Sequence, residues 1–136
     1  MQISIYTDGG ARGNPGISGY GLVVLDQQQN SLYQQSKFLG VKTNNEAEYL
    51  GLIGALTWLK DNQSNIDSVN FYSDSQLMVR QITGLYKVKS PNLKPLFDTA
   101  KKLISQIKPS ISFLDIRRGK NELADSLANQ AMDKCH

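Results

Sequence analysis

Residues 2–16 have the sequence QISIYTDGGARGNPG, in which a strand-like run passes directly into a glycine-rich stretch. Between Gln2 and Asp8 the residues alternate, with Ile3 and Ile5 on one face of the predicted strand and Asp8 on the other. The glycines that begin at Gly9 predict a tight connection to the next strand. This stretch therefore predicts a half-buried first strand that ends on an aspartate.

The following residues extend this strand into a small sheet. Two more strand-like runs, Gly19–Leu25 and Leu32–Leu39, lie on either side of the polar Gln27–Asn30. Three successive strands with short connections predict an antiparallel meander. The hydrophobic period then changes, and Asn44–Lys60 is apolar around most of its circumference, which is typical of a largely buried central helix.

The rest of the chain alternates between strand and helix patterns. The predicted elements are a strand at Val69–Asp74, a helix at Ser75–Thr83, a helix at Leu93–Lys108, a strand at Ile111–Ile116 and a helix at Asn121–Lys134. We therefore predict an α/β fold, a five-stranded mixed sheet of three antiparallel strands followed by alternating helices and strands, with helices packed on it.

Length and composition fit one domain over residues 1–136. The chain is 40% hydrophobic, enough for a core without metal or disulfide support. Its one cysteine, Cys135, makes no intrachain disulfide, and the first residues lack a basic leader or a long apolar run. We expect a cytoplasmic monomer with no membrane segment and no protein partner, and a flexible end that includes the sole histidine, His136.

Charge is unevenly distributed along the chain. Residues 80–120 contain ten Lys or Arg residues and only two acidic ones, whereas the rest of the chain contains five basic and ten acidic residues. This asymmetry suits a polyanionic ligand whose reacting centre also needs a cation. A solvated, lysine-rich helix face is the alternative interpretation.

Two aspartates follow similar strands. Tyr6-Thr7-Asp8 and Tyr72-Ser73-Asp74 each place the aspartate on the same strand face as the tyrosine two residues earlier. If the two strands are neighbours, the carboxylates meet and need a positive partner, for which a divalent ion is suited. Taken singly, Asp8 could start a turn and Asp74 could cap the next helix.

The central helix contains two candidate glutamates. Thr43 and Glu46 match a capping box, which gives Glu46 a structural role. Glu48 shares a stripe with Leu52 and Leu59, so its carboxylate points toward the packed side. This spacing favours Glu48 over Glu46 only modestly, because the helix is apolar nearly all round. Asp125, in the last helix, lies near the buried edge, or is an ordinary exposed charge.

Taken together, these motifs resemble the ribonuclease HI family, and the resemblance runs from Ile3 to Ala131. The matching motifs are Tyr6-Thr7-Asp8-Gly9-Gly10, Gly13-Asn14-Pro15-Gly16, Thr43-Asn44-Asn45-Glu46-Ala47-Glu48, Ser73-Asp74-Ser75-Gln76 and Asn121-Glu122-Leu123-Ala124-Asp125. Because all of these motifs occur together and in the family's order, the resemblance is specific to this family. The set resembles the short form found in archaea and some bacteria, without an added hybrid-binding domain.

The resemblance implies a ribonuclease H, an endonuclease that hydrolyses the RNA strand of RNA-DNA hybrids and leaves 5′-phosphate and 3′-hydroxyl ends. It assigns the catalytic, metal-binding tetrad to Asp8, Glu48, Asp74 and Asp125, and so selects Glu48. Two Mg²⁺ ions are the implied cofactors, roughly 4 Å apart, and Mn²⁺ is expected to substitute for them.

The resemblance also implies how the hybrid is recognised. The implied substrate-binding residues are Asn14, Thr43, Asn44, Asn45 and Gln76. Amide side chains can contact the 2′-hydroxyl that distinguishes RNA from DNA, and Thr43 begins a helix whose free amides suit a phosphate. Tyr86, Lys87, Lys89 and Lys94 match the family's DNA-gripping projection, although a solvated lysine-rich loop would have the same composition.

One loop departs from the family pattern. Many members carry a histidine before the last helix, where this chain has Arg117 and Arg118. An arginine can hold a phosphate but cannot shuttle a proton near neutral pH. The sequence also leaves open two rival functions: a non-catalytic nucleic-acid-binding module, and an exonuclease or transposase core on the same scaffold.

Overall fold

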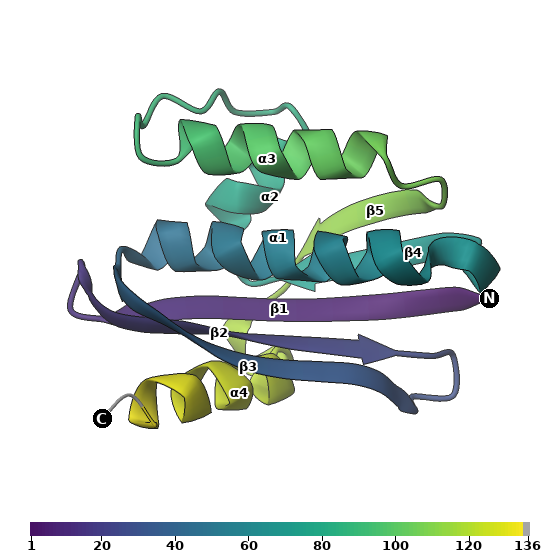
Figure 1. Ribbon diagram of the computed structural model, residues 1–136, viewed down its shortest axis with the longest axis horizontal. Coiled ribbons are helices and arrows are strands. Elements are labelled where there is room, and N and C mark those ends of the chain that lie inside the picture. The colour runs from purple at the N-terminus through teal and green to yellow at the C-terminus, as the bar shows by residue number, and fades with distance from the viewer. Residues whose placement is uncertain (135–136) are drawn as a thin grey trace.

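A computed structural model describes residues 1–134 and has the predicted α/β architecture (Figure 1). The strands are β1 Gln2–Arg12, β2 Gly16–Leu25, β3 Ser31–Lys42, β4 Ser68–Ser73 and β5 Ser110–Asp115. The helices are α1 Asn44–Asn62, α2 Gln76–Ile82, α3 Lys94–Ser105 and α4 Glu122–Asp133, with short 3-10 turns at Gln63–Asn65 and Arg118–Lys120. The flexible end predicted at Cys135 and His136 lies outside the described residues.

The five strands form one mixed sheet in the order β3-β2-β1-β4-β5. β1 pairs antiparallel with β2 and parallel with β4. β2 also pairs antiparallel with β3, and β4 also pairs parallel with β5. The predicted meander and the later alternation of helix and strand are therefore both confirmed.

The first strand is longer than predicted. We expected β1 to end at Asp8 and a turn to begin at Gly9, but β1 continues through both glycines to Arg12, paired with β2. The physical reason is close packing, because a Cβ on Gly9 would overlap the backbone of Ala47 in α1. Gly9 therefore lets a helix approach the strand rather than letting the chain turn.

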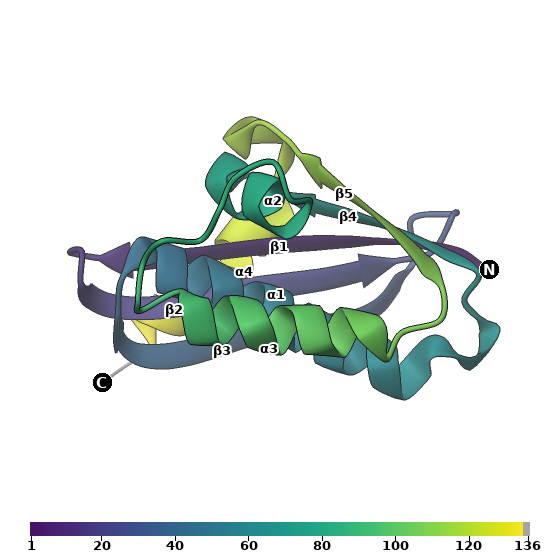
Figure 2. The same ribbon diagram turned by 90° about the horizontal axis from the view of Figure 1, so that it is seen from above.

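Helices cover both faces of the sheet (Figures 1 and 2). Successive residues of β2 point to opposite faces: Tyr20 packs against Gly51 and Gly54 of α1, whereas Gly21 lies against Ala124 of α4. α3 packs on α1, which explains why α1 is apolar nearly all round. The core lies between the sheet, α1 and α3, and α4 forms the second layer on the opposite face.

At most of the other boundaries, the observed end of the helix or strand differs from the predicted end by one to three residues. α2 begins one residue later than expected, because Ser75 is its N-cap and accepts a hydrogen bond from the Met78 amide. α3 ends at Ser105 rather than Lys108. Gly84 follows α2 with φ +88°, the left-handed conformation that commonly ends a helix. None of the helices within residues 1–134 is long and apolar enough to cross a membrane.

Candidate active site

Asp8 and Asp74 meet where β1 and β4 run side by side. Tyr6 pairs with Tyr72 and Thr7 with Ser73, and the next residue along the chain is an aspartate in both cases. Asp8 is 7% exposed, and the side chain of Asp74 is 6% exposed. The condition set by the sequence, that the two strands be neighbours, is therefore met. Asp8 starts no turn, and Ser75 rather than Asp74 caps α2.

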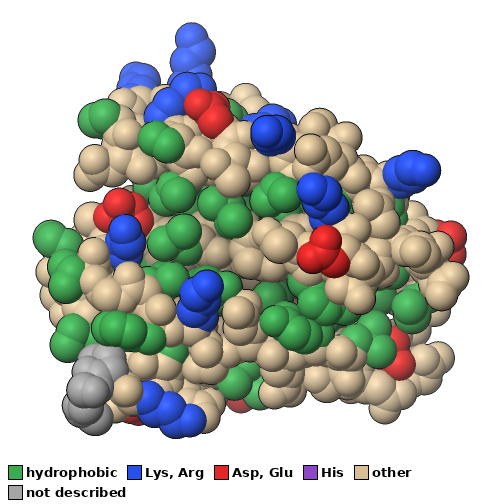
Figure 3. Space-filling model, viewed as in Figure 1, with side chains coloured by type: hydrophobic (Ala, Val, Ile, Leu, Met, Phe, Trp, Pro, Cys, Tyr) green, Lys and Arg blue, Asp and Glu red, His purple; other side chains and the backbone are tan. Residues whose placement is uncertain are grey.

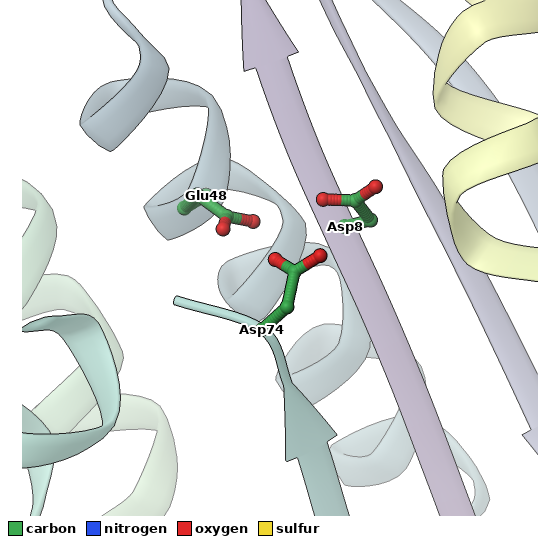
Figure 4. A group of neighbouring side chains, drawn as sticks. All are labelled: Asp8, Glu48 and Asp74. Carbon is green, nitrogen blue, oxygen red and sulfur yellow. The ribbon is translucent and has the colours of Figure 1, made fainter. Parts of the chain in front are cut away.

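Glu48 reaches the same point from α1 (Figure 4). Its Oε1 accepts a hydrogen bond of 2.6 Å from the Gly9 amide, so the residue after Asp8 holds the glutamate in place. Glu46 instead completes the capping box: it accepts from the Thr43 amide at 2.9 Å, and Thr43 Oγ1 accepts from the Glu46 amide at 3.1 Å. The two glutamates thus have separate local roles.

The three carboxylates repel one another in a poorly solvated place. Burial, followed by the charges of Asp74 and Asp125, raises the pKa of Asp8 to about 8. Burial, followed by the charges of Asp8 and Asp74, raises the pKa of Glu48 well above its ordinary value, although the bond from Gly9 opposes this shift. A cation between them would relieve both costs.

The geometry fits a divalent metal. One carboxylate oxygen from each of Asp8, Glu48 and Asp74 lies within 4.8 Å of the other two, and these are the hard oxygen ligands that Mg²⁺ prefers. Among the described residues, the buried Asp74 Oδ2 has no hydrogen-bond partner, and its nearest cationic group, Arg118 Nε, lies 3.9 Å away, so a closer metal ion would stabilise its charge.

Asp125 stands next to this group from the opposite layer. It lines a hollow of about 210 Å³ together with Asp8, Asn44 and Arg118. The proximity of Asp125 contributes to the raised pKa of Asp8. Asp125 is half-buried, as expected for a residue near the buried edge of its helix, whereas Leu123 of the same helix is 48% exposed.

Four amide or hydroxyl residues predicted to bind substrate surround the start of α1. Asn14 Oδ1 accepts from the Asn44 amide at 3.0 Å, and Asn44 Oδ1 accepts from the Ala11 amide at 2.8 Å. These bonds use the oxygens, so the NH₂ groups of both side chains remain as donors. Asn45 is exposed beside them, and Thr43 is the N-cap.

Gln76 follows the end of β4, and the two loop arginines follow the end of β5. Gln76 is exposed at the first position of α2, with its Nε2 at 3.5 Å from Asp115. Arg118 Nε lies 3.9 Å from Asp74 Oδ2 although its side chain is 86% exposed. Arg117 is exposed and lines a separate hollow behind the site.

The predicted basic projection lies farther from the carboxylates. Tyr86, Lys87 and Lys89 are exposed in the connection between α2 and α3, where Tyr86 accepts a hydrogen bond from Arg80 at 2.7 Å. Lys94 forms an ion pair of 3.1 Å with Asp98. Lys and Arg side chains gather along the upper edge of the molecule, over α3 and this connection (Figure 3).

Sequence reasoning missed the role of Asn121. This residue is 1% exposed, and its Nδ2 donates to the Thr7 carbonyl at 2.8 Å, while its own carbonyl accepts from the Asp125 amide at 3.0 Å. Asn121 therefore ties the helix that carries Asp125 to the strand that carries Asp8. The motif Asn121–Asp125 was visible, but its contact with Thr7 spans 114 positions of the chain and has no local signature.

Known proteins resemble this chain over nearly its whole length. Residues 6–131 match a family model described as reverse transcriptase-like. The solved structure of LC11-RNase H1, isolated from compost, is 45% identical, with a TM-score of 0.91 and coverage of 98% of this chain and 96% of that one. The same protein has been solved in complex with an RNA/DNA hybrid.

Two curated bacterial proteins are also similar to this chain. A bifunctional protein of Mycobacterium tuberculosis is 41% identical over 98% of this chain, which spans only 36% of that protein's length. The ribonuclease HI of Haemophilus ducreyi is 33% identical, and the match covers 93% of this chain and 88% of that protein.

Fold and site together define a ribonuclease H-type domain, with a mixed five-stranded sheet that carries a buried carboxylate cluster at its central strands. The chain belongs to the ribonuclease HI family.

Proposed function

We propose that this protein is an endoribonuclease that hydrolyses the RNA strand of RNA-DNA hybrids. The observation that carries the proposal is the convergence of Asp8, Glu48 and Asp74 within 4.8 Å, with one buried Asp74 oxygen that accepts no hydrogen bond from the described residues. Membership in the ribonuclease HI family and the hybrid complex of LC11-RNase H1 support the substrate class.

Asp8, Glu48, Asp74 and Asp125 would hold two Mg²⁺ ions, and Mn²⁺ should substitute for them. Such a pair activates the attacking water on one side of a phosphate and stabilises the leaving oxygen on the other. The chain's part is to position the ligands: Gly9 fixes Glu48, and Asn121 fixes the start of the helix that carries Asp125. Water attack in line with the leaving oxygen would give 5′-phosphate and 3′-hydroxyl ends.

The residues around the start of α1 would select the RNA strand. Asn14, Asn44, Asn45 and Gln76 would contact the minor groove of the hybrid, where amides can donate to and accept from the 2′-hydroxyl. Thr43, at the N-terminus of α1, would hold a phosphate of the DNA strand. Tyr86, Lys87 and Lys89 would contact the DNA backbone farther away, and Arg117 or Arg118 would hold a phosphate near the reacting centre.

We further propose that residues 1–136 work as one domain and as a monomer. We also propose a cytoplasmic location, on the ground that the sequence contains a single cysteine and hence no intrachain disulfide.

A substrate panel tests the proposal. We expect Mg²⁺-dependent cleavage of an RNA-DNA hybrid and little or no cleavage of duplex DNA or single-stranded RNA. Preferential cleavage of duplex DNA would contradict the substrate class, and hybrid binding without cleavage at any Mg²⁺ or Mn²⁺ concentration would favour the non-catalytic module. A hybrid with blocked ends separates the remaining rival, because an exonuclease cannot cut it internally.

A further inference from the structure

Tyr6 and Tyr72 form an aromatic pair directly behind the carboxylates. Their rings stack with centroids 4.8 Å apart and planes at 18°. Each tyrosine lies two residues before a site aspartate and so shares its strand face, roughly 7 Å behind it. Both rings are only half-buried, and the hydrolytic site described above uses neither of them.

Two hollows meet at Tyr6. The first, about 320 Å³, lies between Tyr6, Val23 and Leu25 of the sheet and the start of α4. The second, about 410 Å³, is lined by Tyr6, Tyr72, Ile116, Arg117 and Lys120. Because β1 lies between β4 and β2, Tyr6 has Tyr72 on one side and Val23 on the other. The first hollow is therefore on the side of Tyr6 away from Tyr72.

The rim of these hollows is basic and free of internal ion pairs. Within residues 1–134, the ion pairs involve neither Arg117 nor Lys120. The only acidic residue in either lining is Glu122. The same loop reaches the candidate active site, since Arg118 lies 3.9 Å from Asp74. A line of positive charge thus connects the reacting centre with the aromatic pair.

An aromatic face beside unpaired cations is the chemistry that binds single-stranded nucleic acid, because every base can stack and every nucleotide carries a phosphate. Arg117 and Lys120 supply the phosphate contacts, and Val23 and Leu25 supply an apolar wall opposite α4. An apolar protein segment would leave the two cations at the rim without a negatively charged partner.

We propose that these two hollows, together called the Tyr6 pocket, hold an unpaired nucleotide of the RNA strand where it continues beyond the hybrid. Its base stacks on Tyr6, and its phosphate binds Arg117 and Lys120. The proposal rests on the proposed function, because it takes the cleaved strand as the occupant. It predicts that the protein prefers hybrids whose RNA strand carries a single-stranded extension.

The test is equilibrium binding in EDTA, measured by fluorescence anisotropy, to a blunt hybrid and to the same hybrid with a short RNA extension at its 5′ or 3′ end. Each protein is scored by the ratio of its two affinities, so a general loss of folding or hybrid binding cancels. For the unaltered protein we expect a preference of at least about fivefold for one extended hybrid, the smallest effect of one stacked base.

Four variants assign the preference to the pocket. Tyr6→Leu and Lys120→Gln should bring the ratio close to one, whereas Tyr6→Phe, which keeps the ring, should retain it. Lys101→Gln removes an exposed lysine of α3 and is the matched charge control, with an unchanged ratio.

Equal affinity of the unaltered protein for blunt and extended hybrids would overturn the proposal, as would a full preference in Tyr6→Leu. A pocket that accepts an apolar protein segment instead would also give equal affinities. The proposed function fails differently, through the absence of blunt-hybrid cleavage in Mg²⁺, so the two failures are distinguishable.

Discussion

At the scale of single residues, the carboxylates of Asp8 and Glu48 are held in a place that opposes their charged forms. Both have raised pKa values because they are buried and lie beside other acids. A carboxyl group whose pKa is raised by folding binds more protons in the folded state than in the unfolded state. It therefore contributes to stability at low pH, and this contribution is lost as the pH rises through the folded-state pKa.

This predicts how the metal-free protein responds to pH. In EDTA, the free energy of unfolding should fall between about pH 4 and the Asp8 pKa of about 8. Asp8→Asn removes one of the repelling charges and should raise stability at pH 8 by at least about 1 kcal/mol. Urea unfolding at several pH values measures both effects. A parent whose stability rises over this range would contradict the prediction.

The two glutamates of α1 provide a matched pair for the site. Glu48→Gln should lower hybrid cleavage by at least about 100-fold, because it removes a charged metal ligand. Glu46→Gln keeps a side chain that can still complete the capping box and should leave cleavage within about twofold of the parent. Steady-state cleavage of one hybrid compares them, and equal losses in both variants would contradict the assignment of Glu48.

At the scale of elements, two glycines set how closely the helices approach the sheet. A Cβ on Gly9 would overlap the backbone of Ala47, and one on Gly21 would overlap the Ala124 carbonyl. These approaches bring Glu48 and Asp125 to Asp8 from the two faces of the sheet. Helix packing therefore assembles the site, in addition to the strands.

Gly21→Ala tests this dependence for α4. The added methyl should push α4 away, lower the free energy of unfolding by about 1–3 kcal/mol and reduce cleavage by displacing Asp125. Gly119→Ala is the control for stability, because a Cβ there meets nothing within 4 Å. Thermal unfolding of both variants gives the comparison, and an unchanged melting temperature in Gly21→Ala would show that α4 does not need this close approach.

The elements themselves could be predicted because their signals are local, such as alternation for β1 and a capping box for α1. The extension of β1 through Gly9 could not, because glycine in a turn and glycine under a helix look the same in sequence. Likewise, Asp8 and Asp74 could be placed together from their matching strand ends, whereas the contact of Asn121 with Thr7 depends on how α4 docks.

At the scale of the whole molecule, the buried carboxylate cluster and the basic edge are separate features. The buried acids surround the reacting centre, whereas the basic residues of the α2–α3 connection and α3 lie on the surface at one edge (Figure 3). A nucleic acid could contact this edge and the carboxylates at the same time. Its binding to the basic residues would release counterions, and its scissile phosphate would lie at the carboxylates.

Lys87→Gln combined with Lys89→Gln tests the contribution of this edge. Hybrid affinity should fall most at low salt, and the slope of log affinity against log salt should become shallower by about 0.9 for each lost phosphate contact. Lys60→Gln, at the far end of α1, is the charge control. An unchanged slope in the double variant would mean that Lys87 and Lys89 are only solvated.

We propose above that the buried carboxylates, with divalent metal, hydrolyse the RNA strand of a hybrid. The most direct measurement is cleavage of an end-blocked hybrid by the parent and by Asp74→Asn, in Mg²⁺ and in EDTA, with the product ends identified. We expect internal RNA cuts with 5′-phosphate ends for the parent in Mg²⁺ only, and almost none for Asp74→Asn. Cleavage that survives EDTA, or an Asp74→Asn variant as active as the parent, would contradict the claim.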